Sequence, residues 1–86
     1  MSNHPGRLFV VATPIGNLGD LSDRARAVLA DVDRIAVEDT RHSGRLLARL
    51  GIRAALISVH EHNEAERVAG IVEMLAAGES VALISD

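Results

Sequence analysis

The sequence predicts an α/β fold, with a β-α-β-α-β-α-β arrangement, a parallel sheet and helices on both faces of that sheet. Four short apolar runs are separated by stretches long enough for a helix. This alternation is typical of parallel strands joined by right-handed crossovers. The composition agrees, because 48% of the 86 residues are hydrophobic and only one is aromatic. The core must therefore consist of aliphatic side chains.

The first apolar run, residues 7–12 ("RLFVVA"), is predicted to be a strand buried on both faces. After a polar segment, apolar residues recur at helical spacing and charged residues occupy the other side, which predicts an amphipathic helix. Either Asp20 or Ser22 could cap the N-terminus of this helix. The apolar positions are Leu21, Ala25, Val28, Leu29 and Val32.

The second strand is predicted at residues 34–38 ("RIAVE"), and a short helix follows it. Thr40 is expected to be the N-cap of this helix, and Gly51 is expected to end it. The third strand is predicted at residues 54–59 ("AALISV"). The apolar face of the short helix consists of Leu46, Leu47 and Leu50.

The last helix is predicted to start at Asn63, which together with Glu66 resembles a capping box, and to end at Gly78. Residues 80–86 ("SVALISD") are predicted to be the fourth strand. Because the chain stops on a run that reads as a buried strand, we expect residues 1–86 to be one partial α/β domain, truncated after the fourth strand. The stripe expected to be buried on the last helix is Ala65, Val68, Ala69, Val72, Leu75 and Ala76.

Polar residues gather after the predicted strands rather than before them. The segments that follow the strands are "TPIGNLGD", "DTRHS", "HEHNE" and the terminal Ser85-Asp86, whereas the segments that precede strands are the plain turns "DVD", "GIR" and "GES". In a parallel sheet all segments of the first kind emerge at the carboxyl edge, where α/β proteins bind ligands. The sequence therefore predicts a site along that edge.

The segment at residues 13–20 is longer than most connections between a strand and a helix. Pro14 fixes one φ angle, while Gly16 and Gly19 allow close approach of a ligand to the backbone. Such a segment can present N–H groups to a ligand, or it can be a rigid surface turn. It matches neither Walker A nor G-x-G-x-x-G. Since Glu38 follows at the position of a ribose-binding acid, nucleotide binding of the ordinary Rossmann kind remains an alternative.

The segment "EDTRHS" offers two acids, an arginine and a histidine around a helix start. Glu38 and Asp39 could act as a base or bind a ribose, and Arg41 could hold a phosphate. Alternatively, Asp39 or Thr40 caps the helix and Arg41 is solvated. His60 and His62 are expected on alternate sides of an extended segment, which disfavours a shared metal ion, so no metal is assigned. One of these histidines is expected to line the ligand-binding cleft at the carboxyl edge of the sheet.

Charge and composition narrow the possible partners. The formal net charge is −3, with nine arginines and no lysine, so the chain lacks the basic face of a self-sufficient nucleic-acid binder. If RNA is the substrate, other segments or a second subunit must help to hold it. No apolar run reaches membrane-spanning length and the start lacks signal-peptide features, so we expect no membrane partner. The absence of cysteine fits a cytoplasmic protein.

Four segments in this order carry a family resemblance: "TPIGNLGDLSDRA", "AVEDTRHSGRLL", "HEHNE" and "VALISD". From about Leu8 to Asp86 the chain resembles the rRNA-methylating members of the tetrapyrrole methylase superfamily. The resemblance implies two α/β domains, of which the second is absent from this chain, and S-adenosyl-L-methionine bound between them. It also implies a homodimer that methylates a ribose 2′-hydroxyl of a cytidine in small-subunit (16S) rRNA.

The resemblance implies roles for individual residues as well. Pro14 and Ile15 match positions near the cofactor and substrate cleft, and Gly16 belongs to the same cofactor-binding loop. Asp86 matches the aspartate that opens the family's next glycine-rich segment, which contacts the cofactor. For the chemistry, residue type and position make Asp39 and His42 candidates for the base or the hydroxyl-orienting group, and Arg41 for a phosphate or ribose contact. These candidate catalytic residues are Asp39, His42 and Arg41.

Two other functions remain open at the level of sequence. The chain could belong to another methylase of the same superfamily that acts on a small molecule or a protein, because its negative charge does not favour RNA. It could also be a non-catalytic α/β module that binds a nucleotide or dimerises.

Overall fold

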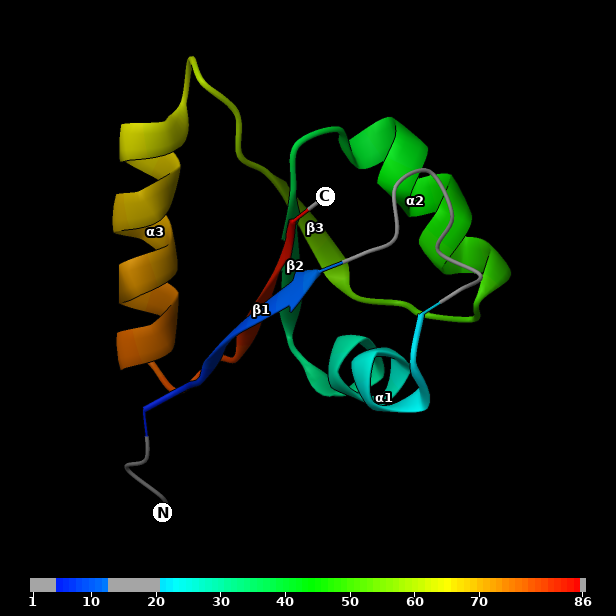
Figure 1. The fold of residues 1–86 in the computed structure, drawn as a ribbon. Helices are drawn as coiled ribbons and strands as arrows, with labels where there is room; N and C mark the ends of the chain where they lie inside the picture. The colour runs from blue at the N-terminus through cyan, green and yellow to red at the C-terminus, as the bar shows by residue number, and fades with distance from the viewer. Residues whose placement is uncertain (1–4, 13–20, 86) are drawn as a thin grey trace.

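The computed structural model describes residues 5–12 and 21–85. In this part of the chain, strands and helices alternate as the sequence predicts (Figure 1). Each observed element lies within or close to its predicted range. In chain order the elements are β1 (Leu8–Ala12), α1 (Asp23–Asp31), β2 (Arg34–Val37), α2 (Thr40–Arg49), β3 (Ala55–Ser58), α3 (Glu64–Ala76) and β4 (Val81–Ser85).

The strands form one parallel sheet in the order β1-β4-β2-β3. The last strand therefore lies between the first and the second, and Val81 of β4 is in register with both Leu8 and Arg34. An ordinary dinucleotide-binding fold places its second strand directly beside its first. The insertion of β4 between β1 and β2 thus argues against the Rossmann alternative.

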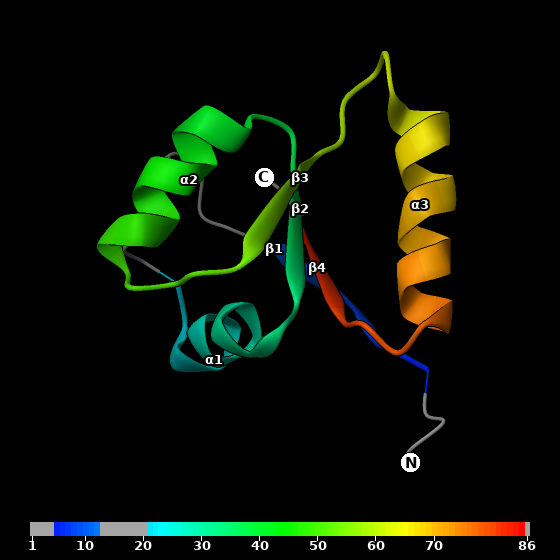
Figure 2. The same ribbon diagram turned by 180° about the vertical axis from the view of Figure 1, so that it is seen from behind.

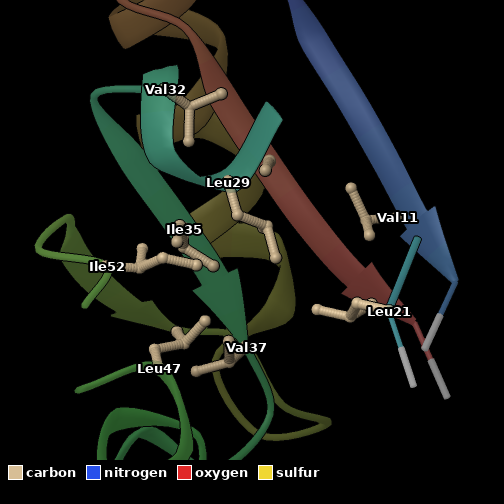
Figure 3. Packing of buried hydrophobic residues seen from close by; sticks show 9 residues of the cluster. Val11, Leu21, Leu29, Val32, Ile35, Val37, Leu47 and Ile52 are labelled. Carbon is tan, nitrogen blue, oxygen red and sulfur yellow. The ribbon is translucent and has the colours of Figure 1, made fainter. Parts of the chain in front are cut away.

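Helices cover both faces of the sheet, which confirms the predicted fold class. Helices α1 and α2 lie on one face and α3 on the other (Figures 1 and 2). Most of the buried side chains lie on the α1/α2 face, where they point toward one another between the helices and the sheet (Figure 3). They are Val11, Leu21, Leu29, Val32, Ile35, Val37, Leu47, Ile52 and Ala82.

Local sequence signals explain where α1 and α2 begin and end. Of the two expected caps of α1, the structure uses Ser22, whose Oγ accepts a hydrogen bond from the Ala25 N–H at 3.1 Å. The N-cap of α2 is Asp39, and the expectation that Thr40 has this role is wrong. Thr40 is instead the first helical residue, because the longer carboxylate of Asp39 reaches two N–H groups of the first turn. Gly51 follows α2 with a φ of 74°, which glycine adopts without strain.

Strand β1 differs from its prediction, because it is not buried on both faces. Leu8 and Val10 are 51% and 67% exposed, whereas Val11 is buried in the core. β1 is an edge strand, and successive side chains of a strand point to opposite faces, so Leu8 and Val10 lie on the α3 face. Helix α3 covers side chains of the other three strands, Ala36, Ile57 and Val81, and leaves β1 open.

The residues of helix α3 that pack against the sheet lie next to the predicted apolar stripe and mostly not within it. Ile71, Met74 and Leu75 pack against the sheet, whereas Val68 and Val72 are 48% and 58% exposed. Of the six predicted residues only Leu75 belongs to this packing face, so the prediction is wrong for most of the stripe. Consecutive residues are about 100° apart around an α-helix, so a small rotation decides which apolar side is buried.

At the amino edge of the sheet, residues of the turns before the strands bond to one another. The Ser80 N–H donates to Asp33 Oδ2 at 2.8 Å, and the Asp33 N–H donates to the Ser80 carbonyl at 2.9 Å. Arg34 Nε lies 3.1 Å from Glu79 Oε1 in a salt bridge. The polar side chains of this edge thus bond to one another, as expected for structural turns.

Candidate functional site

The carboxyl ends of β2 and β3 bring two of the four polar segments side by side. Val37 and Ser58 are paired in the sheet, and the Val59 N–H donates to the Val37 carbonyl at 2.8 Å. Beyond this bond the chain turns to α2 on one face and to α3 on the other (Figures 1 and 2). Divergence of neighbouring connections at the carboxyl edge is where open α/β sheets bind ligands. The sheet therefore places the starts of these two polar segments at its carboxyl edge, as the sequence predicts.

The other two polar segments start from a second pair of neighbouring strands. Ala12 at the end of β1 is in register with Ser85 at the end of β4. Thr13 and Asp86 follow these two residues in the sequence. The predicted cofactor-binding residues Pro14, Ile15, Gly16 and Asp86 lie outside the described residues.

Asp39 is exposed and caps α2 with its carboxylate. Its Oδ1 accepts hydrogen bonds from the N–H groups of Arg41 at 3.0 Å and His42 at 3.4 Å. These bonds, the His42 one first, lower the pKa of Asp39 below its ordinary value, because they favour the charged form. Asp39 is therefore a carboxylate at neutral pH and a weaker base than an ordinary aspartate.

Arg41 and His42 lie in the first turn of α2, and both side chains are exposed. Among the described residues, Arg41 forms no salt bridge. The structure thus brings together the three candidate catalytic residues of the sequence within one capped turn. A carboxylate, an imidazole and a guanidinium there can orient a hydroxyl, accept a proton and contact a phosphate.

The histidines after β3 are arranged differently from the prediction. Residues 61–63 form a turn, and the rings of His60 and His62 lie edge to face with centroids 6.0 Å apart. The expectation that they lie on alternate sides of an extended segment is wrong. The reason is that the His62 N–H donates to His60 Nδ1 at 3.2 Å, which folds the chain back on itself.

Asn63 holds this turn rather than capping α3 with its side chain. It is the N-cap residue by position, but its side chain makes no capping hydrogen bond, so the predicted capping box is absent. Its Oδ1 accepts the His60 N–H at 2.9 Å, and its Nδ2 donates to the Ser58 carbonyl at 3.1 Å. Sequence reasoning missed this role, although asparagine commonly bonds to nearby backbone groups in turns.

Over residues 5–12 and 21–85, no three His, Cys, Asp or Glu side chains come close enough to bind a metal ion. The helices of the same residues are all too short or too polar to span a bilayer.

Comparison with known proteins gives the family. A model of the tetrapyrrole (corrin/porphyrin) methylases matches residues 7–86. The chain belongs to the tetrapyrrole methylase family. This confirms the resemblance seen in the sequence motifs, and it places the carboxyl-edge segments in a methylase family.

Several relatives are similar to this chain over nearly all of its length. The protein from Pasteurella multocida is 51% identical over 86 residues, which is all of this chain and 31% of the relative. The protein from Vibrio cholerae is 53% identical over 79 residues, 92% of this chain and 27% of the relative. The protein from Pseudomonas aeruginosa is 57% identical over 81 residues, 94% of this chain and 29% of the relative.

Each of these three relatives is named ribosomal RNA small subunit methyltransferase I. The chain spans about 30% of the length of the curated relatives it matches.

Proposed function

We propose that this chain is part of an S-adenosyl-L-methionine-dependent methyltransferase that modifies a ribose 2′-hydroxyl of a cytidine in small-subunit rRNA. The observation that carries the proposal is identity of about half the residues, over 92–100% of the chain, to relatives named as small-subunit rRNA methyltransferases. The polar segments on the carboxyl edge support it, because that edge is where this class of sheet binds ligands.

The cofactor would supply an electrophilic methyl group on a sulfonium. Pro14, Ile15, Gly16 and Asp86 are the residues proposed to hold it. The pairing of Ala12 with Ser85 supports a common role, because the two segments that contain these residues continue from adjacent strand ends.

The chain's own chemistry is to align the acceptor hydroxyl and to remove its proton. Asp39 is poorly suited to take that proton, since its hydrogen bonds lower its pKa. We assign it the orienting role, which a fixed carboxylate on a capped helix can perform. His42, in the same turn, is then the proposed proton acceptor, because an imidazole nitrogen can act as a general base. Arg41 is the proposed phosphate contact.

The whole protein is proposed to be a cytoplasmic homodimer with a second α/β domain, consistent with the greater length of the relatives. Its RNA-binding surface must include segments other than this chain, because the chain carries a net charge of −3. The same charge favours the second candidate function, methylation of a small molecule or a protein by the same fold.

The test uses the full-length protein, S-adenosylmethionine with a labelled methyl group, and small ribosomal subunits that lack the modification. We expect the label on a cytidine ribose, identified by nuclease digestion and mass spectrometry. Arg41→Ala is expected to raise the KM for the subunits. The matched variant Arg53→Ala is not expected to raise this KM, because residue 53 precedes β3 at the opposite edge of the sheet. Label on a base, or transfer only to a small molecule or a protein, would contradict the rRNA proposal.

A further inference from the structure

The turn between β3 and α3 fixes which nitrogen of His60 carries the proton. His60 Nδ1 accepts a hydrogen bond from the His62 N–H at 3.2 Å. A ring nitrogen that accepts a hydrogen bond carries no proton, so the proton of the neutral imidazole must lie on Nε2. Within this turn, His60 is therefore a hydrogen-bond donor at its outer nitrogen and not a proton acceptor there.

The same turn also fixes the place of this donor. Asn63 Oδ1 accepts the His60 N–H at 2.9 Å, while Asn63 Nδ2 donates to the Ser58 carbonyl at the end of β3. One side chain thus ties the backbone of His60 to the strand. The His60 side chain is half-buried, and its ring contacts the ring of His62 edge to face. Such a residue is positioned before any ligand arrives, which reduces the entropy cost of binding.

His60 also follows a strand end that is paired with the strand preceding the candidate catalytic residues. The hydrogen bond from the Val59 N–H to the Val37 carbonyl joins β3 to β2 directly before His60 and Glu38. Asp39 and Arg41 follow on the β2 side. An acceptor strand that runs along this edge would meet a guanidinium from one segment and a neutral N–H donor from the other.

We propose that His60 is an RNA-binding residue that donates its Nε2–H to a phosphate oxygen of the acceptor strand, beside the nucleotide that is methylated. The inference rests on the proposed function. Phosphate oxygens accept hydrogen bonds from neutral side-chain donors as well as from arginine, and such contacts set the register of a nucleic acid on a protein. Asn63 is the positioning residue that holds His60.

Two substitutions of His60 separate the effect of its Nε2–H donor from the effect of its hydrogen bond within the turn. In His60→Asn, the side-chain oxygen can replace Nδ1 as the acceptor for the His62 N–H, but the outer donor is lost. In His60→Gln, the amide nitrogen can reach the position of Nε2 and keep a donor there. Glu61→Gln is the matched control, because it changes an exposed side chain of the same turn that makes none of these contacts.

The kinetic test uses these variants in the full-length protein, with unmethylated small subunits as substrate. We expect His60→Asn to raise the KM for the subunits about three- to tenfold, the effect of one hydrogen bond, with kcat within about twofold. His60→Gln should restore the KM, and Glu61→Gln should not change it. The KM for S-adenosylmethionine should stay constant in all three, and thermal melts should confirm equal folding.

A second measurement reads the tautomer directly. Two-bond ¹H–¹⁵N correlation spectra of the full-length protein should show the His60 proton on Nε2. A proton on Nδ1, or an unchanged KM in His60→Asn, would overturn the inference. A loss confined to kcat would also overturn it, because that result would indicate a proton-transfer role. If the wild-type protein does not methylate rRNA at all, it is the proposed function that fails.

Discussion

Asp39 combines a structural role with a proposed catalytic one, and both depend on the same carboxylate. Its Oδ1 caps α2 through the N–H groups of Arg41 and His42. These are also the two neighbours proposed to act on the substrate. Any change at Asp39 therefore affects both the helix and the placement of the candidate site.

Asparagine and alanine at position 39 should separate the two roles. Asp39→Asn should keep the melting temperature of the 86-residue chain nearly unchanged, because asparagine is an equally good N-cap, whereas Asp39→Ala should lower it. In the full-length protein, Asp39→Asn should reduce turnover far more than cofactor affinity. Unchanged turnover in Asp39→Asn would remove Asp39 from the catalytic residues.

The lowered pKa of Asp39 also has a predicted pH dependence. Its pKa in the folded chain lies below the ordinary value of 3.8. The stability that the ionised cap contributes is therefore present above pH 3.8 and is lost as the pH falls through the folded pKa. Melting curves between pH 6 and pH 2 should show a smaller acid-induced loss in Asp39→Asn than in the wild type; equal losses would contradict this assignment.

Two glycines should respond oppositely to alanine. The N–H of Gly6 bonds to the Leu75 carbonyl at 2.7 Å, and a Cβ on Gly6 would overlap the carbonyl group of Glu79. Gly6→Ala should therefore destabilise the chain by about 1–3 kcal/mol. A Cβ on Gly70, inside α3, meets no atom within 4 Å, so Gly70→Ala should stabilise it by about 0.5–1 kcal/mol. Urea denaturation of both variants measures the difference, and equal effects would contradict the close packing at Gly6.

At the level of elements, α3 shows how a helix can be correctly located and wrongly oriented. Its length and end were predicted, because apolar spacing and Gly78 mark them in the sequence. The sequence did not predict which apolar side of α3 packs against the sheet. Valines and alanines occupy one side of the helix, and Ile71, Met74 and Leu75 occupy the adjacent side.

The orientation of α3 predicts different effects at two adjacent positions. Ile71→Ala removes side-chain contacts with the sheet and should destabilise the 86-residue chain by about 1–3 kcal/mol. Val72→Ala should be neutral or slightly stabilising, because Val72 is exposed and alanine is the better helix former. Denaturant melts of the two variants give the comparison. A larger loss for Val72→Ala would mean that the predicted stripe was right.

For the strands and the site as well, the sequence predicts the features that depend on neighbouring residues and misses those that depend on tertiary contacts. Apolar runs predicted every strand, but "RLFVVA" does not reveal that β1 is an edge strand, since that depends on where β4 inserts. Likewise, the order of polar segments predicted a site at the carboxyl edge. The turn that joins His60 to His62 was not predictable from spacing, because it depends on hydrogen bonds that Asn63 and His60 make to the backbone.

For the whole molecule, the main feature is a set of exposed apolar side chains on β1 and α3, namely Leu8, Val10, Val68 and Val72, here called the apolar surface. A right-handed crossover from β4 to a new parallel strand beside β1 would run in the same direction as the crossover from β3 to β4. Its helix would therefore lie on the α3 face. The relatives are about three times as long as this chain, so we expect a following segment to cover this surface in the whole protein.

Polar substitutions on this surface should have opposite consequences in the short and the full-length protein. Val10→Thr combined with Val72→Gln should reduce self-association of the 86-residue chain, because it removes exposed apolar area. In the full-length protein the same pair should lower the stability by about 2–4 kcal/mol, because both side chains are then buried. Sedimentation and thermal melts measure the two effects. No loss of stability in the full-length protein would show that the surface stays open.

The pairing of β1 with β4 has a consequence for biosynthesis. Arg7 and Ser80, which are hydrogen-bonded beside this pair, are separated by 73 residues in the chain. Strand β1 therefore has no partner in the described sheet until β4 has left the ribosome. Contacts between such distant segments form slowly, and an unpaired apolar strand is prone to misassembly in the meantime. We expect nascent chains whose β4 is still inside the ribosome to be recognised by chaperones, and the emergence of β4 to weaken this recognition.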